Sequence, residues 1–327
     1  MKIKATASGK VFLTGEYMAL EGGKAIILST PQKARINLIE NDFRQNIFTS
    51  SMDRKSYNFI VNNPSKINWL KEDPIETGSI LEEAIRKFNR KFNNQSISID
   101  TNEFFINDKK IGIGSSAAVS VALIKAFNDL FQTELSSRQI IDYAIDIHRK
   151  AQGSEGSGFD VVSSYIESKA VVCRLLEGKS YEYSPIEFPE EIIVLAVLGD
   201  ASIKTSIMIK RYKDAKKKNP KYFLKQAEAM KAELDHLHSS LLKKDYQLII
   251  EHLRTYNDLL LDLDSKFEVG IFNHHHEMLN LANSKNIFYK PSGAGGGDLG
   301  LMISHDRAEI NGICEILKSK DINFFEI

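Results

Sequence analysis

The chain has 327 residues, of which 43% are hydrophobic and 26% charged, enough for one large core or two medium ones. Its 43 Lys and Arg residues balance 43 Asp and Glu residues, so the overall charge argues against a nucleic-acid partner, and an anionic substrate would need local charges. The sequence shows neither an apolar secretion signal nor a run of about 18 apolar residues, which predicts a soluble, cytoplasmic protein with no membrane partner.

The amino-terminal segment reads as two short strands, residues 3–7 and 11–13, on either side of Ser8-Gly9-Lys10, which puts Lys10 on or beside a strand and close to a turn. A lysine at a strand edge is usually solvated. The apolar run after Lys10 instead indicates a partly buried segment, in which a lysine needs an anionic partner. A mostly antiparallel set of strands is predicted next, at residues 25–28, 35–39, 47–49 and 57–61.

A helical period begins at Ser79, and a short strand at residues 97–99 leads into the stretch Ile111–Val119, IGIGSSAAV. Its glycines and serines lie where a turn opens into a helix, expected from about Ala117, so several backbone N–H groups could point at a phosphate. The spacing is neither that of a Walker A loop nor that of a Rossmann loop. The alternative is a structural helix start in which Ser115 or Ser116 acts only as the cap.

Ser136 is expected to open another helix, which carries His148; a hydrogen-bonded histidine at the core edge is favoured there over a catalytic one. The loop that follows, QGSEGSGFDVVSSY at residues 152–165, brings Asp160 to the start of an apolar segment. Asp160 is either the cap of a helix or a carboxylate that faces the phosphate loop, where it could orient Lys10 or accept a proton.

Strands at residues 169–175 and 192–198 come next, with a new unit beginning between them, near residues 185–189. The loop after the second strand contains Lys204 and Thr205. A basic run follows, which is either a solvated helix face or a source of charge for a phosphorylated substrate. Two long helices are then predicted, at residues 220–242 and 246–263.

The triplet His274-His275-His276 is expected to start a helix with exposed imidazoles, because consecutive helical residues diverge too far to share one metal ion. The stretch KPSGAGGGDLGLMI, residues 290–303, has four glycines in the five positions after Ser292. Such a density of glycine indicates close backbone approach, to a ligand or to another loop, and an apolar strand follows. A helix at residues 306–318 and a strand at 322–325 close the chain.

Three of these stretches, taken together and in this order, resemble the motifs of the GHMP family of small-molecule kinases. They are ASGKVFLTGEYMALEGGKAI at residues 7–26, GIGSSAA at 112–118 and PSGAGGGDLGLMI at 291–303. The resemblance implies a two-domain α+β fold. An amino-terminal domain like ribosomal protein S5 domain 2 would span residues 1–187, and a ferredoxin-like domain would span residues 188–327, with the active site in the cleft between them.

The resemblance also implies roles for individual residues. Lys10 and Asp160 would flank the transferred phosphoryl group, and Ser116 would place its hydroxyl near Mg²⁺. The residues expected to wrap the ATP phosphates are Gly112, Ile113, Gly114, Ser115, Ser116 and Ala117. The residues expected on the acceptor side are Ser157, Lys204, Thr205 and Ser292. The implied partner is a phosphorylated small molecule; a hydroxyl acceptor such as a sugar, or a catalytically silent ligand-binding role, stays open, as does the oligomeric state.

Overall fold

The structure is a computed structural model that describes residues 1–43, 45–63, 66–74, 77–153, 156–176, 180–201 and 203–327. Ser154 and Glu155 of the QGSEGSGFDV stretch, and Ser202, lie outside the described residues. The chain folds into two compact units, described here separately: the N-unit, Met1–Lys10 with Ser29–Glu167, and the C-unit, Val11–Leu28 with Ser168–Ile327. A domain boundary at residues 187/188 stays a prediction.

Two long strands, β1 (Lys2–Thr14) and β2 (Lys24–Glu40), pair with each other, and each contributes residues to both units. In the N-unit, the second half of β2 pairs antiparallel with β6, and β3 pairs parallel with the other edge of β6. The remaining sheet strands continue antiparallel in the order β3, β4, β5. The bounds of these strands are Asn46–Ser50 for β3, Ser56–Asn63 for β4, Lys66–Trp69 for β5 and Gln95–Asp100 for β6.

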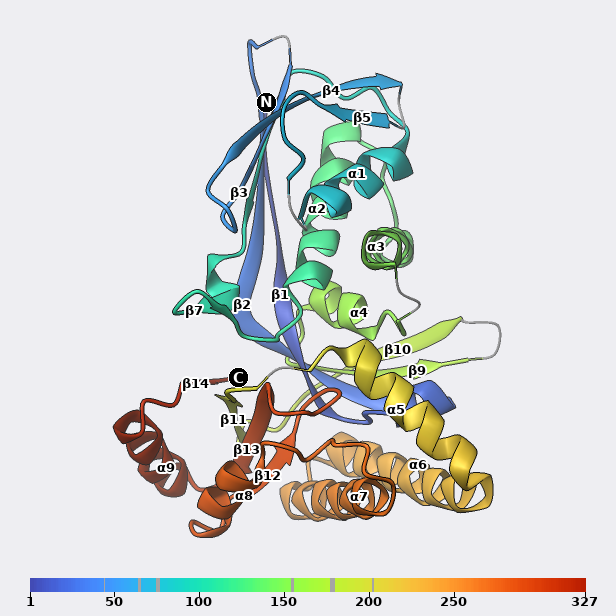
Figure 1. The fold of residues 1–327 in the computed structure, drawn as a ribbon, viewed down its shortest axis with the longest axis vertical. Helices are drawn as coiled ribbons and strands as arrows, with labels where there is room; N and C mark the ends of the chain where they lie inside the picture. The colour runs from blue at the N-terminus through green and yellow to red at the C-terminus, as the bar shows by residue number, and fades with distance from the viewer. Residues whose placement is uncertain (44, 64–65, 75–76, 154–155, 177–179, 202) are drawn as a thin grey trace. The chain divides into compact units, whose positions relative to one another are not determined.

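Helices α1, α2 and α3 lie together on one side of the N-unit strands (Figure 1). Their buried faces supply much of the core of this unit, and α2 is buried along most of its length because its residues are small or apolar. The helices of the unit are α1 (Thr77–Phe88), α2 (Ser115–Phe131), α3 (Ser137–Gln152) and α4 (Phe159–Ile166). A short helix η2 (Asn102–Phe104) and the small hairpin of β7 (Phe105–Ile106) and β8 (Lys109–Lys110) precede the phosphate loop.

The C-unit contains β9 (Ala170–Leu175), which pairs with the first half of β2 and with β10 (Tyr181–Ile186). A second, fully antiparallel sheet has the order β12-β13-β11-β14. Its strands are β11 (Ile193–Leu198), β12 (Phe288–Pro291), β13 (Leu299–Ser304) and β14 (Phe324–Glu326).

The helices of the C-unit carry two separate apolar clusters. One lies among α5, α6, α7 and the short helix η1 (Met18–Glu21), and the other lies between the second sheet and α8 and α9. The helix bounds are α5 (Thr205–Lys218), α6 (Pro220–Lys243), α7 (Tyr246–Phe267), α8 (His276–Asn283) and α9 (Arg307–Ser319). None of the helices in the described ranges is both long and apolar enough to cross a membrane.

The break predicted between two short strands at Ser8-Gly9-Lys10 is wrong, because β1 runs unbroken through these residues, and Lys10 lies on a strand as predicted. A Cβ at Gly9 would lie 2.5 Å from Thr30 Oγ1 and 3.0 Å from the Ile113 carbonyl oxygen. The glycine therefore allows close packing inside a continuous strand, where the sequence suggested a break between two strands. The strands predicted at residues 25–28 and 35–39 are likewise parts of the single strand β2.

Candidate active site

The IGIGSSAAV stretch, Ile111–Val119, enters α2 through two glycines in left-handed backbone conformation, Gly112 with φ 74° and Gly114 with φ 81°. Gly114 is the N-cap of α2, and no described side chain caps this helix. The alternative in which Ser115 or Ser116 caps the helix is therefore wrong, since both serines lie inside its first turn. The unpartnered N–H groups and the positive end of the helix dipole together favour an anion at this position.

Lys10 lies at the end of the N-unit part of β1, where its backbone N–H donates to the Ile113 carbonyl at 2.8 Å. A Cβ at Gly114 would lie 2.9 Å from Lys10 Cε, so the lysine stem passes directly over the glycine. The Lys10 Nζ lies 3.4 Å from Asp160 Oδ2, which confirms the predicted anionic partner. A cation is thus held beside the helix amino terminus.

Asp160 lies in the first turn of α4, whose N-cap is Gly158, so of the two alternatives for Asp160 the helix cap is wrong. Its side chain is 34% exposed. Burial is the largest single effect and would raise the pKa of this carboxyl, but the charges of Lys10 and His148 and the hydrogen bonds to the carboxylate together hold the pKa below its ordinary value. Asp160 is therefore an anion near neutral pH.

Ser116 belongs to a small hydrogen-bonded group with His148 and Gln152. The Gln152 amide donates to Ser116 Oγ at 2.8 Å, and Ser116 Oγ lies 3.1 Å from His148 Nε2. Since Oγ accepts from the amide, its own proton is available to Nε2, which requires a neutral imidazole. Burial, and then the charge of Lys10, lower the pKa of His148 against the opposing effect of Asp160, in agreement with that neutral state.

The predicted hydrogen-bonded state of His148 is confirmed, but the sequence did not indicate that its partner is the loop serine. Gln152 was also missed, because a glutamine at the end of an amphipathic helix carries no distinctive signal. Arg149 was missed as well: its guanidinium donates to the carbonyls of Gly156 and Ser157 at 2.9 and 3.2 Å. Arg149 thereby fixes the segment that leads into α4.

Ser157, predicted on the acceptor side, lies two residues before α4, and its Oγ accepts from the Phe159 N–H at 3.4 Å. The other three predicted acceptor residues belong to the C-unit. Lys204 is the N-cap of α5, and Thr205 is the first residue of that helix. Ser292 is buried, and its hydroxyl donates to the Phe12 carbonyl at 2.9 Å. Their roles towards a substrate stay predictions.

The glycine-rich third motif folds as a loop between β12 and β13, with Gly293, Gly295, Gly296 and Gly297 all at positive φ. The Gly296 N–H donates to the Ile271 carbonyl at 3.0 Å, and a Cβ at Gly295 would lie 2.4 Å from that same oxygen. The close backbone approach predicted for this stretch is thus present, and its partner inside the C-unit is another loop.

His275 holds this loop from the other side. Its Nε2 accepts from the Gly297 N–H at 3.1 Å, and its Nδ1 lies 2.7 Å from the Tyr289 hydroxyl. The prediction of three exposed imidazoles is wrong for His275, which is buried; His274 and His276 are exposed. Burial, followed by the charge of Lys290, lowers the pKa of His275 to about 4.

Magnesium requires oxygen ligands, and in phosphoryl-transfer sites one or two carboxylates hold it together with substrate phosphates. The N-unit offers the partly exposed Asp160 carboxylate and the Ser116 hydroxyl. Gln152 occupies one lone pair of that hydroxyl oxygen, which leaves the second for a metal. The donor chemistry of these two residues fits Mg²⁺.

The comparisons with known proteins agree with this geometry. Residues 79–168, which include the phosphate loop and Asp160, match the family described as GHMP kinases N terminal domain. This part of the chain is thus similar to the amino-terminal domain of GHMP kinases, and the predicted mixed α+β fold of GHMP kinase structures is confirmed.

Individual relatives are more distant. The phosphomevalonate kinase of Saccharolobus solfataricus is 25% identical over 167 residues, 51% of this chain and 48% of the relative. The mevalonate kinase of Archaeoglobus fulgidus is 26% identical over 160 residues, 48% of each chain. The chain thus matches about half the length of these relatives.

Solved structures extend the fold likeness to the whole chain. The Lin0012 protein from Listeria innocua superposes with a TM-score of 0.86 at 19% identity, covering 99% of this chain and 97% of that one. The Streptococcus pneumoniae phosphomevalonate kinase, in complex with phosphomevalonate and AMPPNP, superposes with a TM-score of 0.79 at 20% identity, covering 99% and 100%.

Proposed function

We propose that this protein is an ATP-dependent small-molecule kinase that phosphorylates phosphomevalonate to diphosphomevalonate. The observation that carries the proposal is the Lys10–Asp160 pair beside the uncapped amino terminus of α2, reached through two glycines. A phosphate-binding loop with an adjacent fixed cation is what transfer of a phosphoryl group requires. Because the proposed substrates are small charged metabolites, the proposal also includes a cytoplasmic location.

In the proposed reaction, an oxygen of the acceptor phosphate forms a bond to the γ-phosphorus of ATP. The bond from that phosphorus to the β–γ bridging oxygen breaks, and ADP leaves. The transition state is loose, so the protein contributes mainly position and positive charge. The backbone N–H groups of the loop and α2 hold the phosphates, and Lys10 balances the charge on the transferred group. Bound Mg²⁺, held by Asp160 and Ser116, would neutralise further phosphate charge.

The proposal makes a specific prediction about Asp160. An acceptor phosphate is largely ionised near neutral pH, so no base has to remove a proton from it. Asp160 then serves to orient Lys10 and the metal, and asparagine keeps one oxygen for that purpose, whereas methionine at position 10 removes the positive charge of the lysine altogether. We expect Asp160→Asn to retain more activity than Lys10→Met with phosphomevalonate as the acceptor, measured as kcat from ADP release. An Asp160→Asn enzyme as impaired as Lys10→Met would refute this assignment of roles.

A hydroxyl acceptor is the second candidate, because a mevalonate kinase matches the chain about as well as a phosphomevalonate kinase does. A hydroxyl must lose its proton during transfer, and Asp160 would then act as the base, so Asp160→Asn would lose most activity.

ADP release measured with mevalonate, phosphomevalonate, diphosphomevalonate and simple sugars separates these candidates. Turnover with phosphomevalonate alone supports the proposal, and preference for mevalonate or a sugar overturns it. ATP binding without turnover of any acceptor would indicate a catalytically silent ligand-binding protein.

A further inference from the structure

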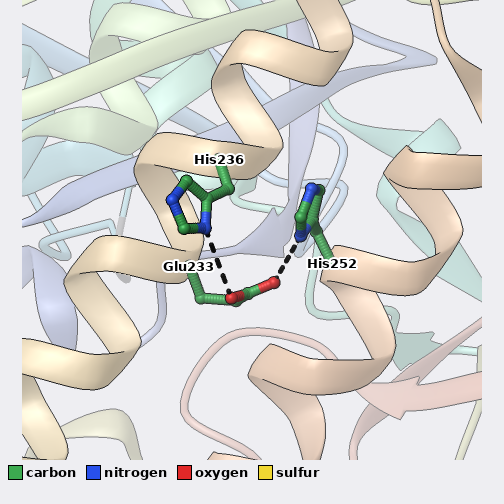
Figure 2. Close-up of side chains that lie close together, drawn as sticks. All are labelled: Glu233, His236 and His252. Carbon is green, nitrogen blue, oxygen red and sulfur yellow. Dashed lines mark hydrogen bonds and ion pairs between the residues drawn. The ribbon is translucent and has the colours of Figure 1, made fainter.

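Helices α6 and α7 of the C-unit are joined by a short turn and pack side by side (Figure 1). Three metal-ligating side chains converge between them: Glu233 and His236, one turn apart on α6, and His252 on α7. Figure 2 shows the two imidazoles on either side of the Glu233 carboxylate. This cluster could not be predicted from the sequence, because Glu233 and His252 are 19 residues apart and lie on different helices.

The donor atoms already lie close to one another. His252 Nδ1 lies 2.5 Å from Glu233 Oε1, and His236 Nδ1 lies 3.7 Å from Glu233 Oε2. All three donors lie within 4.8 Å of one another. In a tetrahedral zinc site with bonds of about 2.0–2.2 Å, ligand atoms lie roughly 3.3 Å apart. Side-chain rotations alone would therefore bring these three atoms around one ion.

The backbone beneath the cluster is fixed, which favours binding. Leu234 and Leu237 on α6, and Leu253 on α7, are buried in the core beside the ligand-bearing positions. The Glu233 and His252 side chains are mostly buried, at 14% and 19% exposure, whereas His236 is 65% exposed. The site thus has two preorganised ligands and one solvent-facing ligand that can close over an arriving ion.

The chemistry of these three side chains indicates which metal ion the site would bind. Two imidazole nitrogens and one carboxylate oxygen suit zinc, which takes this set with water in the fourth position. Magnesium and calcium prefer all-oxygen shells, so the ion proposed for the kinase reaction is not expected here. We propose that Glu233, His236 and His252 form a zinc site that cross-links α6 to α7. This proposal does not depend on the proposed kinase function.

A zinc ion held this way would stabilise helices that also support the first motif. Four residues after His252, the Tyr256 hydroxyl donates to the Glu16 carbonyl at 2.6 Å, and Lys24 pairs with Asp235 on α6 at 2.9 Å. Cross-linking α6 to α7 therefore restrains the elements that hold residues 16–24. The role is structural, and its readouts are metal stoichiometry and thermal stability.

The test uses the full-length chain without a histidine tag, stripped with a chelator and then titrated with Zn²⁺ by calorimetry. We expect one zinc per chain, and a melting temperature raised by about 5 °C or more when free zinc is about 100 times its Kd. Cobalt in place of zinc should give the visible absorption bands of a tetrahedral site.

The variants His252→Gln and His236→Gln should each weaken zinc binding by about 100-fold or more and abolish the shift in melting temperature. His236 is exposed, so its substitution does not threaten folding. The matched control is His238→Gln: this histidine is on the same helix, but its Nδ1 lies 3.0 Å from Lys24 Nζ and outside the cluster, so zinc binding should be unchanged. No zinc binding, or binding that His236→Gln and His252→Gln leave intact, would overturn the proposal.

Discussion

The buried ion pair between Lys290 and Glu16 offers the sharpest test of what holds the C-unit together. The Lys290 side chain is 0% exposed and that of Glu16 is 2% exposed. Lys290 Nζ donates to Glu16 Oε1 at 2.6 Å and to the Pro291 carbonyl at 2.5 Å. Glu16 Oε2 is buried and has no hydrogen-bond partner among the described residues. The Glu16 charge therefore depends on a single lysine.

We expect Lys290→Met to lower the free energy of unfolding by about 3–5 kcal/mol, because it leaves a carboxylate buried without a compensating charge. Methionine has a similar length and keeps most of the apolar contact, so lost packing should contribute little. Urea unfolding, followed by circular dichroism, measures the change.

The control is the double variant Glu16→Gln with Lys290→Met, which removes both charges. Its loss of unfolding free energy should be smaller than the sum of the losses in the two single variants, because no unpaired charge is then left buried. A loss below about 1 kcal/mol for Lys290→Met, or simple additivity in the double variant, would refute the reasoning.

Two further predictions concern the loops of the two units. Gly114→Ala forces a Cβ to within 2.9 Å of Lys10 Cε at φ 81°; the free energy of unfolding should fall by about 1–2 kcal/mol. ADP release should fall on the order of 10- to 100-fold. Gly153→Ala is the matched control, since it carries the same backbone strain with nothing within 4 Å, and it should leave turnover unchanged. The pKa of His275 is about 4 in the folded state and about 6.5 in the unfolded state. The neutral imidazole therefore contributes to the stability of the fold above pH 6.5, and this contribution is lost as the pH falls towards 4. The free energy of unfolding should therefore be about 2 kcal/mol lower at pH 5 than at pH 7 because of this histidine, and His275→Gln should remove that part of the difference. If the free energy of unfolding of the variant changed with pH as much as that of the natural protein, the prediction would be contradicted.

Much of the fold could be predicted from the sequence, because the signals are local. The capping box at Ser136 and the cap at Asp306 start α3 and α9 where the pattern indicates. Errors arose where one residue type serves two purposes. Gly9 was placed in a break between two strands, yet it is a close-contact residue within β1, and only the neighbouring Thr30 and the Ile113 carbonyl reveal the difference.

In the candidate site, too, some features could be predicted from local sequence and others could not. The need of Lys10 for an anion follows from the apolar run after it, and Asp160 supplies that anion. The partners of Ser116 could not be predicted, because His148 and Gln152 reach it from another helix, and helical periodicity says nothing about which distant hydroxyl a side chain meets. His275 was misjudged for a related reason: a histidine triplet is polar on average, but the left-handed glycine at Gly297 needs an acceptor for its N–H.

Two charged residues of the first motif, residues 7–26, differ in their surroundings, and the sequence alone does not reveal the difference. Lys10 and Glu16 are six residues apart, and each neutralises a charge within its own unit: Lys10 with Asp160 in the N-unit, and Glu16 with Lys290 in the C-unit. The Lys10 pair is partly exposed and so can exchange Asp160 for a ligand phosphate, whereas the buried Glu16 pair has no access to any ligand. A substitution at Lys10 should therefore reduce turnover with little loss of stability, and one at Glu16 should reduce stability first. In the proposed kinase, this motif would thus contribute Lys10 to catalysis and Glu16 to folding.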